Sequence, residues 1–426
     1  MIVQLVLRIL ALIVLIPLST VTLAQNIDDL PPANTSDSSI PQNALPAPDD
    51  APDLTQPPLI VRPPSVTPGL GPTFAPEGMT NNWVSIGPGP TIDGQVENIA
   101  NLEVIGAVHV VLPHPTDADI LYIGAVNGGV WKTDDATSAS PSWTPLTDTF
   151  SSLSISALVF DPNDTSYDTI VAAVGTNSSY ASIGGARIGL LRTTNGGNTW
   201  TQLDGGGVLT GADITGVVVR GSTIVVSVDF ADTYIYGNVG IFRSTDTGAS
   251  FSQISLGDGS TTGLPGGISY DLASHPDDPS VLYTNMNFAT DVGGINGIYQ
   301  SVDTGASWVK VSDSAMDSVL TSGGTNNIEF SIHNSANDNV VYCAILNFGQ
   351  LLGGGVFRSE DAGATWTAMD IPVTNETDVG GNNGVVGTNP RYKPTAGGEA
   401  PGSAYPGGQG AIHFSILADP TDPDIV

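Results

Sequence analysis

One short pattern recurs along the middle of the chain, and any fold must accommodate every copy. Each copy is a glycine, then aliphatic or aromatic residues, then a hydroxyl residue, as expected of a short strand. The copies begin at Gly129, Gly189, Gly240, Gly297 and Gly355. The spacings are therefore 60, 51, 57 and 58 residues. A period in this range, with strand-type alternation inside each unit, is typical of a β-propeller, in which each unit forms one small sheet.

A turn with a common composition follows four of these strands. Asp or Asn stands at its third position, Gly at its fifth and an aromatic residue at its last. We expect the Asp to accept backbone N–H bonds, the Gly to supply a positive φ and the aromatic side chain to pack between sheets. The polar members are Asn195, Asp246, Asp303 and Asp361, and the aromatic members are Trp200, Phe251, Trp308 and Trp366. A fifth turn is degenerate, because an insertion separates Thr133–Asp135 from Trp143.

These octapeptides resemble the Asp box, S-x-D-x-G-x-T-W, of the BNR/Asp-box repeat family, which includes sialidase-like, sortilin-like and xyloglucanase-like propellers. The resemblance implies an all-β propeller of four-stranded antiparallel blades over residues 82–426. It also implies that the boxes are structural, because in those propellers they lie away from the ligand face. The chain contains five complete units and the start of a sixth at Leu417–Pro423. We therefore expect an incomplete ring and a fragment of a longer protein, with Trp83–Ile86 as the strand that would close it.

The segment before the repeats predicts export. Residues 1–24 place Arg8 before an apolar run and end in small residues, which is the layout of a signal peptide cut near Ala24. Residues 25–81 are rich in Pro, Asp and Ser, so we expect a disordered linker. We expect a secreted or cell-surface protein without a membrane span after cleavage. The lone cysteine, Cys343, lies in an apolar run and is interpreted as a core residue.

The charge of the chain excludes one class of partner. Its formal net charge is -31, from 42 acidic and 11 basic residues. Such a surface repels phosphate backbones, so nucleic acid is not expected as a partner. The partners that remain are carbohydrate or a cell-surface protein.

The second strand of each unit ends in Asn or Asp, where propellers usually open on their ligand face. These residues are Asn127, Asn177, Asp229, Asn287 and Asn347. Nearby Asp232, Tyr234 and Asp291 add the carboxylates and aromatics of a carbohydrate platform, or of a weak calcium site that lacks any recognised calcium-loop spacing. The alternative interpretation is that these are ordinary turn residues, with Phe230 and Phe288 packing between blades.

Enzymatic activity is not indicated. Matched residue by residue to the xyloglucanase-like family, a catalytic Asp falls on Val126. The Arg-Ile-Pro motif of sialidases has Arg187-Ile188-Gly189 as its nearest approach. No catalytic residue, metal ligand set or cofactor is predicted. His114, His275 and His333 fall in or near a repeated Pro-containing turn and are expected at the surface.

The sequence thus favours an extracellular binding or adhesion module, with glycans as candidate ligands. Two alternatives stay open. The chain is either part of a glycoside hydrolase whose catalytic carboxylates lie in further C-terminal blades, or a structural spacer in a larger surface protein.

Overall fold

The computed structural model describes residues 107–176, 184–231, 238–260, 263–322, 324–333, 339–347, 351–370 and 414–426. The predicted signal peptide, the linker and Trp83–Ile86 lie outside the described residues. Within them, no helix is both long and apolar enough to cross a membrane.

The described residues form five four-stranded antiparallel sheets, each with its strands in chain order. The first sheet contains β1 (Val108–Pro113), β2 (Leu121–Ala125), β3 (Gly129–Thr133) and β4 (Thr144–Pro145). The second contains β5 (Ile155–Phe160), β6 (Thr169–Val174), β7 (Leu190–Thr194) and β8 (Thr201–Leu203). The third contains β9 (Ala212–Arg220), β10 (Thr223–Ala231), β11 (Gly240–Ser244) and β12 (Ser252–Gln253).

The last two sheets carry the short helices of the fold. The fourth sheet contains β13 (Leu272–Ser274), β14 (Leu282–Met286), β15 (Gly297–Ser301) and β16 (Val309–Lys310), with the 3-10 helix η5 (Ala289–Val292) after β14. The fifth contains β17 (Thr325–Ile332), β18 (Val341–Asn347), β19 (Leu351–Ser359) and β20 (Thr367–Ala368). Helix α2 (Ser314–Val319) connects these two sheets.

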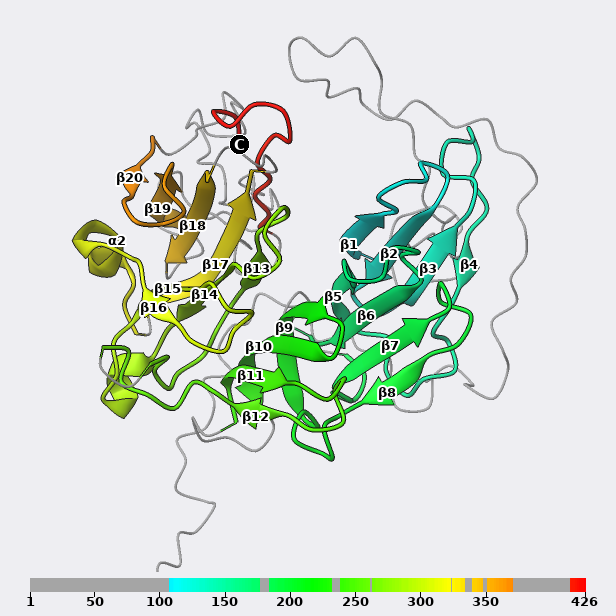
Figure 1. Ribbon diagram of the computed structural model, residues 1–426, viewed down its shortest axis with the longest axis horizontal. Coiled ribbons are helices and arrows are strands. Elements are labelled where there is room, and N and C mark those ends of the chain that lie inside the picture. The colour runs from blue at the N-terminus through cyan, green and yellow to red at the C-terminus, as the bar shows by residue number, and fades with distance from the viewer. Residues whose placement is uncertain are drawn as a thin grey trace, which may run out of the picture. The chain divides into compact units, whose positions relative to one another are not determined.

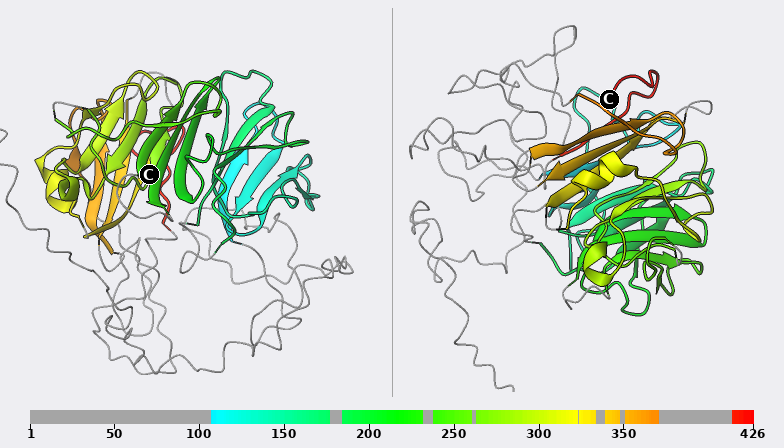
Figure 2. Two further views of the ribbon diagram at one scale, coloured as in Figure 1. Left: turned by 90° about the horizontal axis from the view of Figure 1, so that it is seen from below. Right: turned by 90° about the vertical axis from the view of Figure 1, so that its left-hand side faces the viewer.

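Consecutive sheets pack face to face, with their first strands closest together. The first strands β1, β5, β9, β13 and β17 contact one another in sequence, and Figure 1 shows them toward the middle with the fourth strands outside. Figure 2 shows the same sheets from two further sides. Four of the six apolar clusters of the described residues span two sheets, as where Val171 and Leu190 of the second sheet join Ile214 and Val226 of the third. Burial of such residues between sheets is the main stabilising term of this arrangement.

The box turns have the hydrogen bonds that the sequence predicts. In the third sheet, Asp246 Oδ1 accepts from Ser250 N at 2.9 Å and Ser244 Oγ at 2.7 Å, and Ser250 Oγ donates to Oδ2 at 2.6 Å. These bonds hold the pKa of the Asp246 carboxyl at about 2. Asn195 takes the same place, since its Oδ1 accepts from Thr199 N and its Nδ2 donates to Thr199 Oγ1, each at 2.9 Å.

The boxes also connect neighbouring sheets. The carbonyl of the residue after the box Asp or Asn accepts a bond from the preceding sheet in three cases. Tyr122 donates to Gly196 O at 3.0 Å, Arg243 Nε donates to Thr304 O at 3.0 Å, and Tyr283 donates to Ala362 O at 2.9 Å. This residue has a positive φ each time, so the turn aims its carbonyl at the neighbouring sheet. The geometry of the boxes is architectural.

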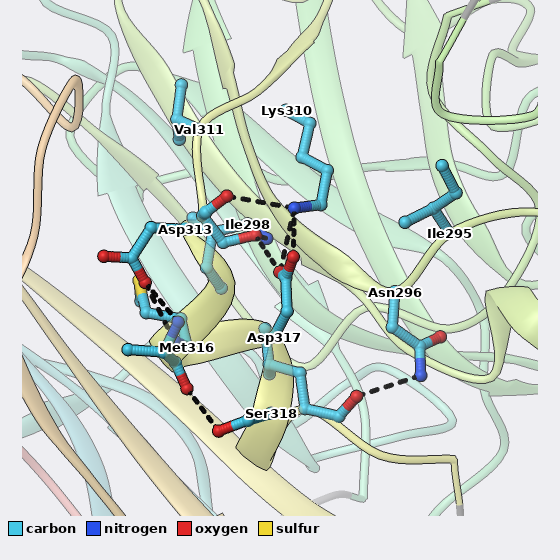
Figure 3. A network of polar contacts seen from close by, with 12 residues as sticks. Ile295, Asn296, Ile298, Lys310, Val311, Asp313, Met316, Asp317 and Ser318 are labelled. Carbon is cyan, nitrogen blue, oxygen red and sulfur yellow. Dashed lines mark hydrogen bonds and ion pairs between the residues drawn. The ribbon is translucent and has the colours of Figure 1, made fainter.

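Helix α2 is held against the fourth sheet by one charged network (Figure 3). Lys310 Nζ donates to both carboxylate oxygens of Asp317, at 2.8 and 2.7 Å, and Ser312 Oγ donates to Asp317 Oδ1 at 2.8 Å. Asp313 caps the helix by accepting from Ala315 N and Met316 N. Asn296 Nδ2 donates to Leu320 O at 3.2 Å just beyond the helix. The helix thereby buries Met316 in the core between the fourth and fifth sheets.

Four of the five first strands, all except β13, are irregular at the end where they begin. One extra residue interrupts the pairing with the second strand between Ile155 and Ala157, and likewise between Thr325 and Asn327. In two sheets the extra residue has a hydroxyl that reaches the next sheet. Ser156 Oγ donates to Ile214 O, and Thr215 Oγ1 donates to Ser269 O at 3.1 Å. These bulges connect the sheets at the edge opposite the boxes.

Residues 414–426 pack against the fifth sheet, and no strand is assigned to them. Ala418 N donates to Ser331 Oγ at 2.7 Å, and Tyr342 donates to Pro423 O at 2.5 Å. The predicted sixth unit is thus represented by a segment that contacts the fifth sheet as a next blade would. Closure by Trp83–Ile86 stays a prediction.

Two of the turn histidines are not at the surface, contrary to the expectation from sequence. His275 and His333 are 6% and 2% exposed. His275 Nδ1 accepts from Asp277 N at 3.2 Å and Asp278 N at 3.1 Å, so the ring caps the Pro-containing turn from inside. Cys343 is buried in the core, as predicted.

Candidate functional site

The candidate site lies where the first strand of each sheet begins and the second ends, at the edge opposite the boxes. Two of the predicted ligand residues lie there in neighbouring sheets, Asp229 near the end of β10 and Asn287 just after β14. Around them the structure gathers side chains that we call the inter-sheet polar site. It consists of Arg187, Asp213, Asp229, Phe230, Tyr270, Asp271, Asn285, Asn287 and Glu329.

Of the other predicted ligand residues, the structure describes the side chains of Asn127 and Asp291, and neither belongs to this site. Asn127 is exposed after β2, and its Oδ1 accepts from Ser154 Oγ at 2.6 Å, which connects the first two sheets. Asp291 is exposed on η5. Asn347 is the last residue of β18, described by its backbone alone. Asn177, Asp232 and Tyr234 lie outside the described residues.

Asp213 is the most fully bonded member of the site. This buried side chain begins the inner strand β9, and its Oδ1 accepts from Thr176 N at 2.5 Å. Its Oδ2 accepts from Thr176 Oγ1 at 2.9 Å and from Arg187 Nη2 at 3.4 Å. The carboxylate therefore orients Arg187 from the neighbouring sheet.

Phe230 is the exposed aromatic of the site. The Arg187 guanidinium lies 5.0 Å from the centre of its ring, yet 43% of the residue stays exposed. Phe230 thus contacts the neighbouring sheet through Arg187 and still presents part of its surface to solvent. A large apolar ring held in place at a polar edge is the arrangement of a binding platform.

Asp229 is the extra residue of a bulge in β10. Val228 pairs with Ile214 and Phe230 with Asp213, so Asp229 has no partner across the ladder. Its Oδ1 is enclosed and makes no hydrogen bond to any described residue. Burial, and next the charge of Asp213, raise the pKa of the Asp229 carboxyl well above its ordinary value. Bulges commonly re-aim a side chain beside a functional site.

The fourth sheet contributes a tyrosine and two enclosed amides. Tyr270 donates to Thr325 O at 2.9 Å, and burial together with the charge of Asp229 raises the pKa of its hydroxyl. Asn285 Oδ1 accepts from Tyr270 N at 2.9 Å and Asp271 N at 3.2 Å. Both Asn285 and Asn287 are 0% exposed, and the Nδ2 of each lacks a hydrogen-bond partner among the described residues. These enclosed amide donors could therefore donate hydrogen bonds to a bound ligand.

Asp271 and Glu329 bring a second pair of carboxyls from the fourth and fifth sheets. Asp271 accepts from Leu272 N at 2.7 Å and Phe330 N at 2.8 Å, yet burial raises the pKa of this carboxyl to about 6. Burial and the Asp271 charge raise the pKa of Glu329 well above its ordinary value. Because each carboxyl is buried and the two lie close together, ionisation of both at once is disfavoured.

Most of this site was not predicted. Asp213, Tyr270 and Asp271 lie before or at the start of first strands, whereas the predicted residues lie at the ends of second strands. The polar residues that open each first strand are a signal that would have identified these three. Glu329 lies in the middle of β17, and no local pattern marks it. No group of three or more His, Cys, Asp or Glu side chains in the described part of the chain is placed to hold a metal ion.

No protein-family model matches the chain, and no curated protein sequence matches it. Among solved structures, an ancestral GH74 enzyme is 16% identical, with a TM-score of 0.44 over 67% of this chain and 32% of that one. The GH74 xyloglucanase from Xanthomonas campestris is 16% identical, with a TM-score of 0.43 over 62% of this chain and 39% of its own. The extracellular domain of a one-component system from B. thetaiotaomicron is 12% identical, with a TM-score of 0.36 over 62% and 28%.

The chain thus spans less than two-fifths of the length of these proteins. Such likenesses assign no role to any residue. The strand order, the repeated sheets and the converging first strands define an all-β propeller of four-stranded antiparallel blades.

Proposed function

We propose that the protein is a secreted or cell-surface propeller that binds carbohydrate at the inter-sheet polar site. The observation that carries the proposal is the set of enclosed, unpartnered polar atoms beside an exposed ring. Asn285 Nδ2 and Asn287 Nδ2 require acceptors, and Asp229 Oδ1 lacks a partner. A sugar hydroxyl accepts from one group while donating to another, so it satisfies both kinds at once.

The ring of Phe230 supports the same ligand class. Sugars have apolar C–H faces that pack on aromatic rings, and Phe230 is held by Arg187 rather than free to collapse onto the protein. A site with a few placed polar groups beside an apolar surface is the usual form of a small-ligand site.

Hydrolysis is the second candidate, favoured by one observation. Asp213 and Asp229 are close enough that the charge of one raises the pKa of the other, while only Asp213 is paired with an arginine. Neighbouring carboxyls held in different environments are the arrangement that acid–base glycosidases use.

Glycan-array screening followed by calorimetry tests the proposal. Replacing Phe230 by alanine is expected to weaken oligosaccharide binding by roughly tenfold, about 1.4 kcal/mol, because the platform is lost. The matched control is Val302→Ala, which truncates a residue that is 63% exposed in a box turn of the opposite edge and is expected to bind as the native protein does.

Absence of binding to every glycan tested, or equal binding by the Phe230→Ala variant, would refute the proposed site. Release of reducing sugar that ceases in Asp213→Asn would instead establish the hydrolase.

A further inference from the structure

The charges around the inter-sheet polar site are unbalanced. Four carboxyl groups lie there, Asp213, Asp229, Asp271 and Glu329, and Arg187 is the single cationic side chain of the site. Arg187 pairs with Asp213 at 3.4 Å, and no other lysine or arginine among the described residues pairs with the remaining three acidic side chains. These three are the groups whose pKa values burial raises.

Enclosed polar atoms beside the acidic side chains indicate a ligand site. Asn285 is 0% exposed and its Nδ2 lacks a hydrogen-bond partner among the described residues, while the buried Asn287 amide lies beside the Tyr270 hydroxyl and interacts with it. Tyr270 in turn lies within electrostatic reach of Asp229. An enclosed donor and a partnerless carboxyl oxygen therefore lie around one tyrosine, at the border between the third and fourth sheets.

A ligand must match both kinds of group. Amide donors require a ligand oxygen, and the acidic side chains favour a ligand that carries positive charge. Polyanionic glycans fail the second condition, because the whole chain has a formal net charge of -31. Neutral sugars satisfy the amides, whereas a ligand with an ammonium group can in addition form an ion pair with a carboxyl group that ionises on binding.

We infer that the preferred ligand is an amino sugar with a free, protonated amine, such as a glucosamine oligosaccharide, with the amine facing Asp229 and a ring hydroxyl facing Asn285. This inference rests on the proposed carbohydrate-binding function and narrows its ligand class. Deacetylated chitin fragments have the required chemistry, since each residue offers hydroxyl groups, an apolar face for Phe230 and an ammonium group.

Binding of an ammonium group should change the protonation of the buried carboxyls. A raised pKa favours the protonated form of a buried carboxyl, and an arriving ammonium group favours the ionised form. We therefore expect binding to release protons from the site, by the same linkage that relates pKa to stability. No bond is made or broken, and the proton passes to the buffer.

Calorimetry at pH 5, where the sugar amine is already protonated in free solution, with the tetrasaccharides of glucosamine and of N-acetylglucosamine tests the inference. We expect the glucosamine oligomer to bind at least tenfold more tightly. We also expect its apparent binding enthalpy to differ between two buffers of unlike ionisation enthalpy. Asp229→Asn and Glu329→Gln should each reduce the preference, whereas Glu360→Gln, with the same charge change at a residue with a 70% exposed side chain beside a box, should retain it.

The outcomes separate the two proposals. Equal binding of both oligomers, or tighter binding of the acetylated one, overturns the amine inference and leaves carbohydrate binding intact. Binding of neither oligomer nor of any arrayed glycan removes both. If Asp229→Asn fails to fold, the buffer dependence of the native protein still decides, because an equal enthalpy in both buffers contradicts proton release.

Discussion

Replacing Gly240 by alanine is expected to lower the free energy of unfolding by roughly 3 kcal/mol. Gly240 begins β11 with a φ of 96°, a conformation that L side chains rarely adopt. An added Cβ would lie 2.8 Å from Gly267 O and would also crowd Ser255 Oγ, which accepts from Ile241 N. Urea unfolding followed by circular dichroism measures the change.

Gly297→Ala is the matched control, because Gly297 holds the same place in the fourth sheet without a positive φ. Its added Cβ would meet Lys310 Cε, the end of a flexible side chain, at 2.7 Å and Ser312 Oγ at 2.9 Å. We expect less than half the loss. Equal losses in the two variants would show that backbone conformation is not why glycine leads each repeat.

The stability of the native protein is expected to fall as pH rises from 4 to 8. Asp271 has a folded-state pKa of about 6, above its ordinary value of 3.8, and the pKa values of Glu329 and Asp229 are also raised. An acidic group whose pKa is higher in the folded state stabilises the fold fully below its unfolded pKa. This stabilisation is lost as pH rises through its folded pKa. For Asp271 alone the linkage is on the order of 3 kcal/mol.

The box carboxylates act in the opposite direction. Hydrogen bonds hold the pKa of Asp246 at about 2, so its contribution is present above the unfolded value and is lost as pH falls toward 2. We therefore expect maximum stability near pH 4, close to the unfolded pKa that both kinds of carboxyl share. Glu329→Gln should raise stability at pH 8 and flatten the slope above pH 5, whereas Glu360→Gln should leave the slope unchanged. A stability that is constant or rises between pH 5 and 8 in the native protein would contradict this electrostatic picture.

The repeated sheets were predictable because their signals are local. Gly, Asp and an aromatic residue at fixed offsets define a turn whatever surrounds it. Where Asn195 replaces the Asp, its side-chain oxygen still accepts the backbone hydrogen bond from Thr199 N. The site was only partly predictable. Asp229 and Asn287 were identified as ends of second strands, but their neighbours Asp213, Tyr270 and Glu329 come from other strands or other sheets.

The physical reason is that bulges and inter-sheet contacts decide which side chains meet. Nothing in the local pattern of β10 indicates that Asp229 would be the extra residue of a bulge, because pairing register depends on the partner strand. Similarly, His275 was expected at the surface since its turn is polar, yet its ring nitrogen caps that turn from within. The composition of the site and the burial of His275 thus depend on contacts between residues far apart in the sequence.

Hydrogen–deuterium exchange with and without a bound oligosaccharide tests the central claim most directly. The inter-sheet polar site predicts protection of peptides covering Ala212–Ala231 and the segment from Ser269 to Asn287, with no change in the box turns around Asp246 and Asp303. Protection confined to the box turns, or saturating binding without protection at β9, β10 and β14, would contradict the claim that ligands bind at this edge.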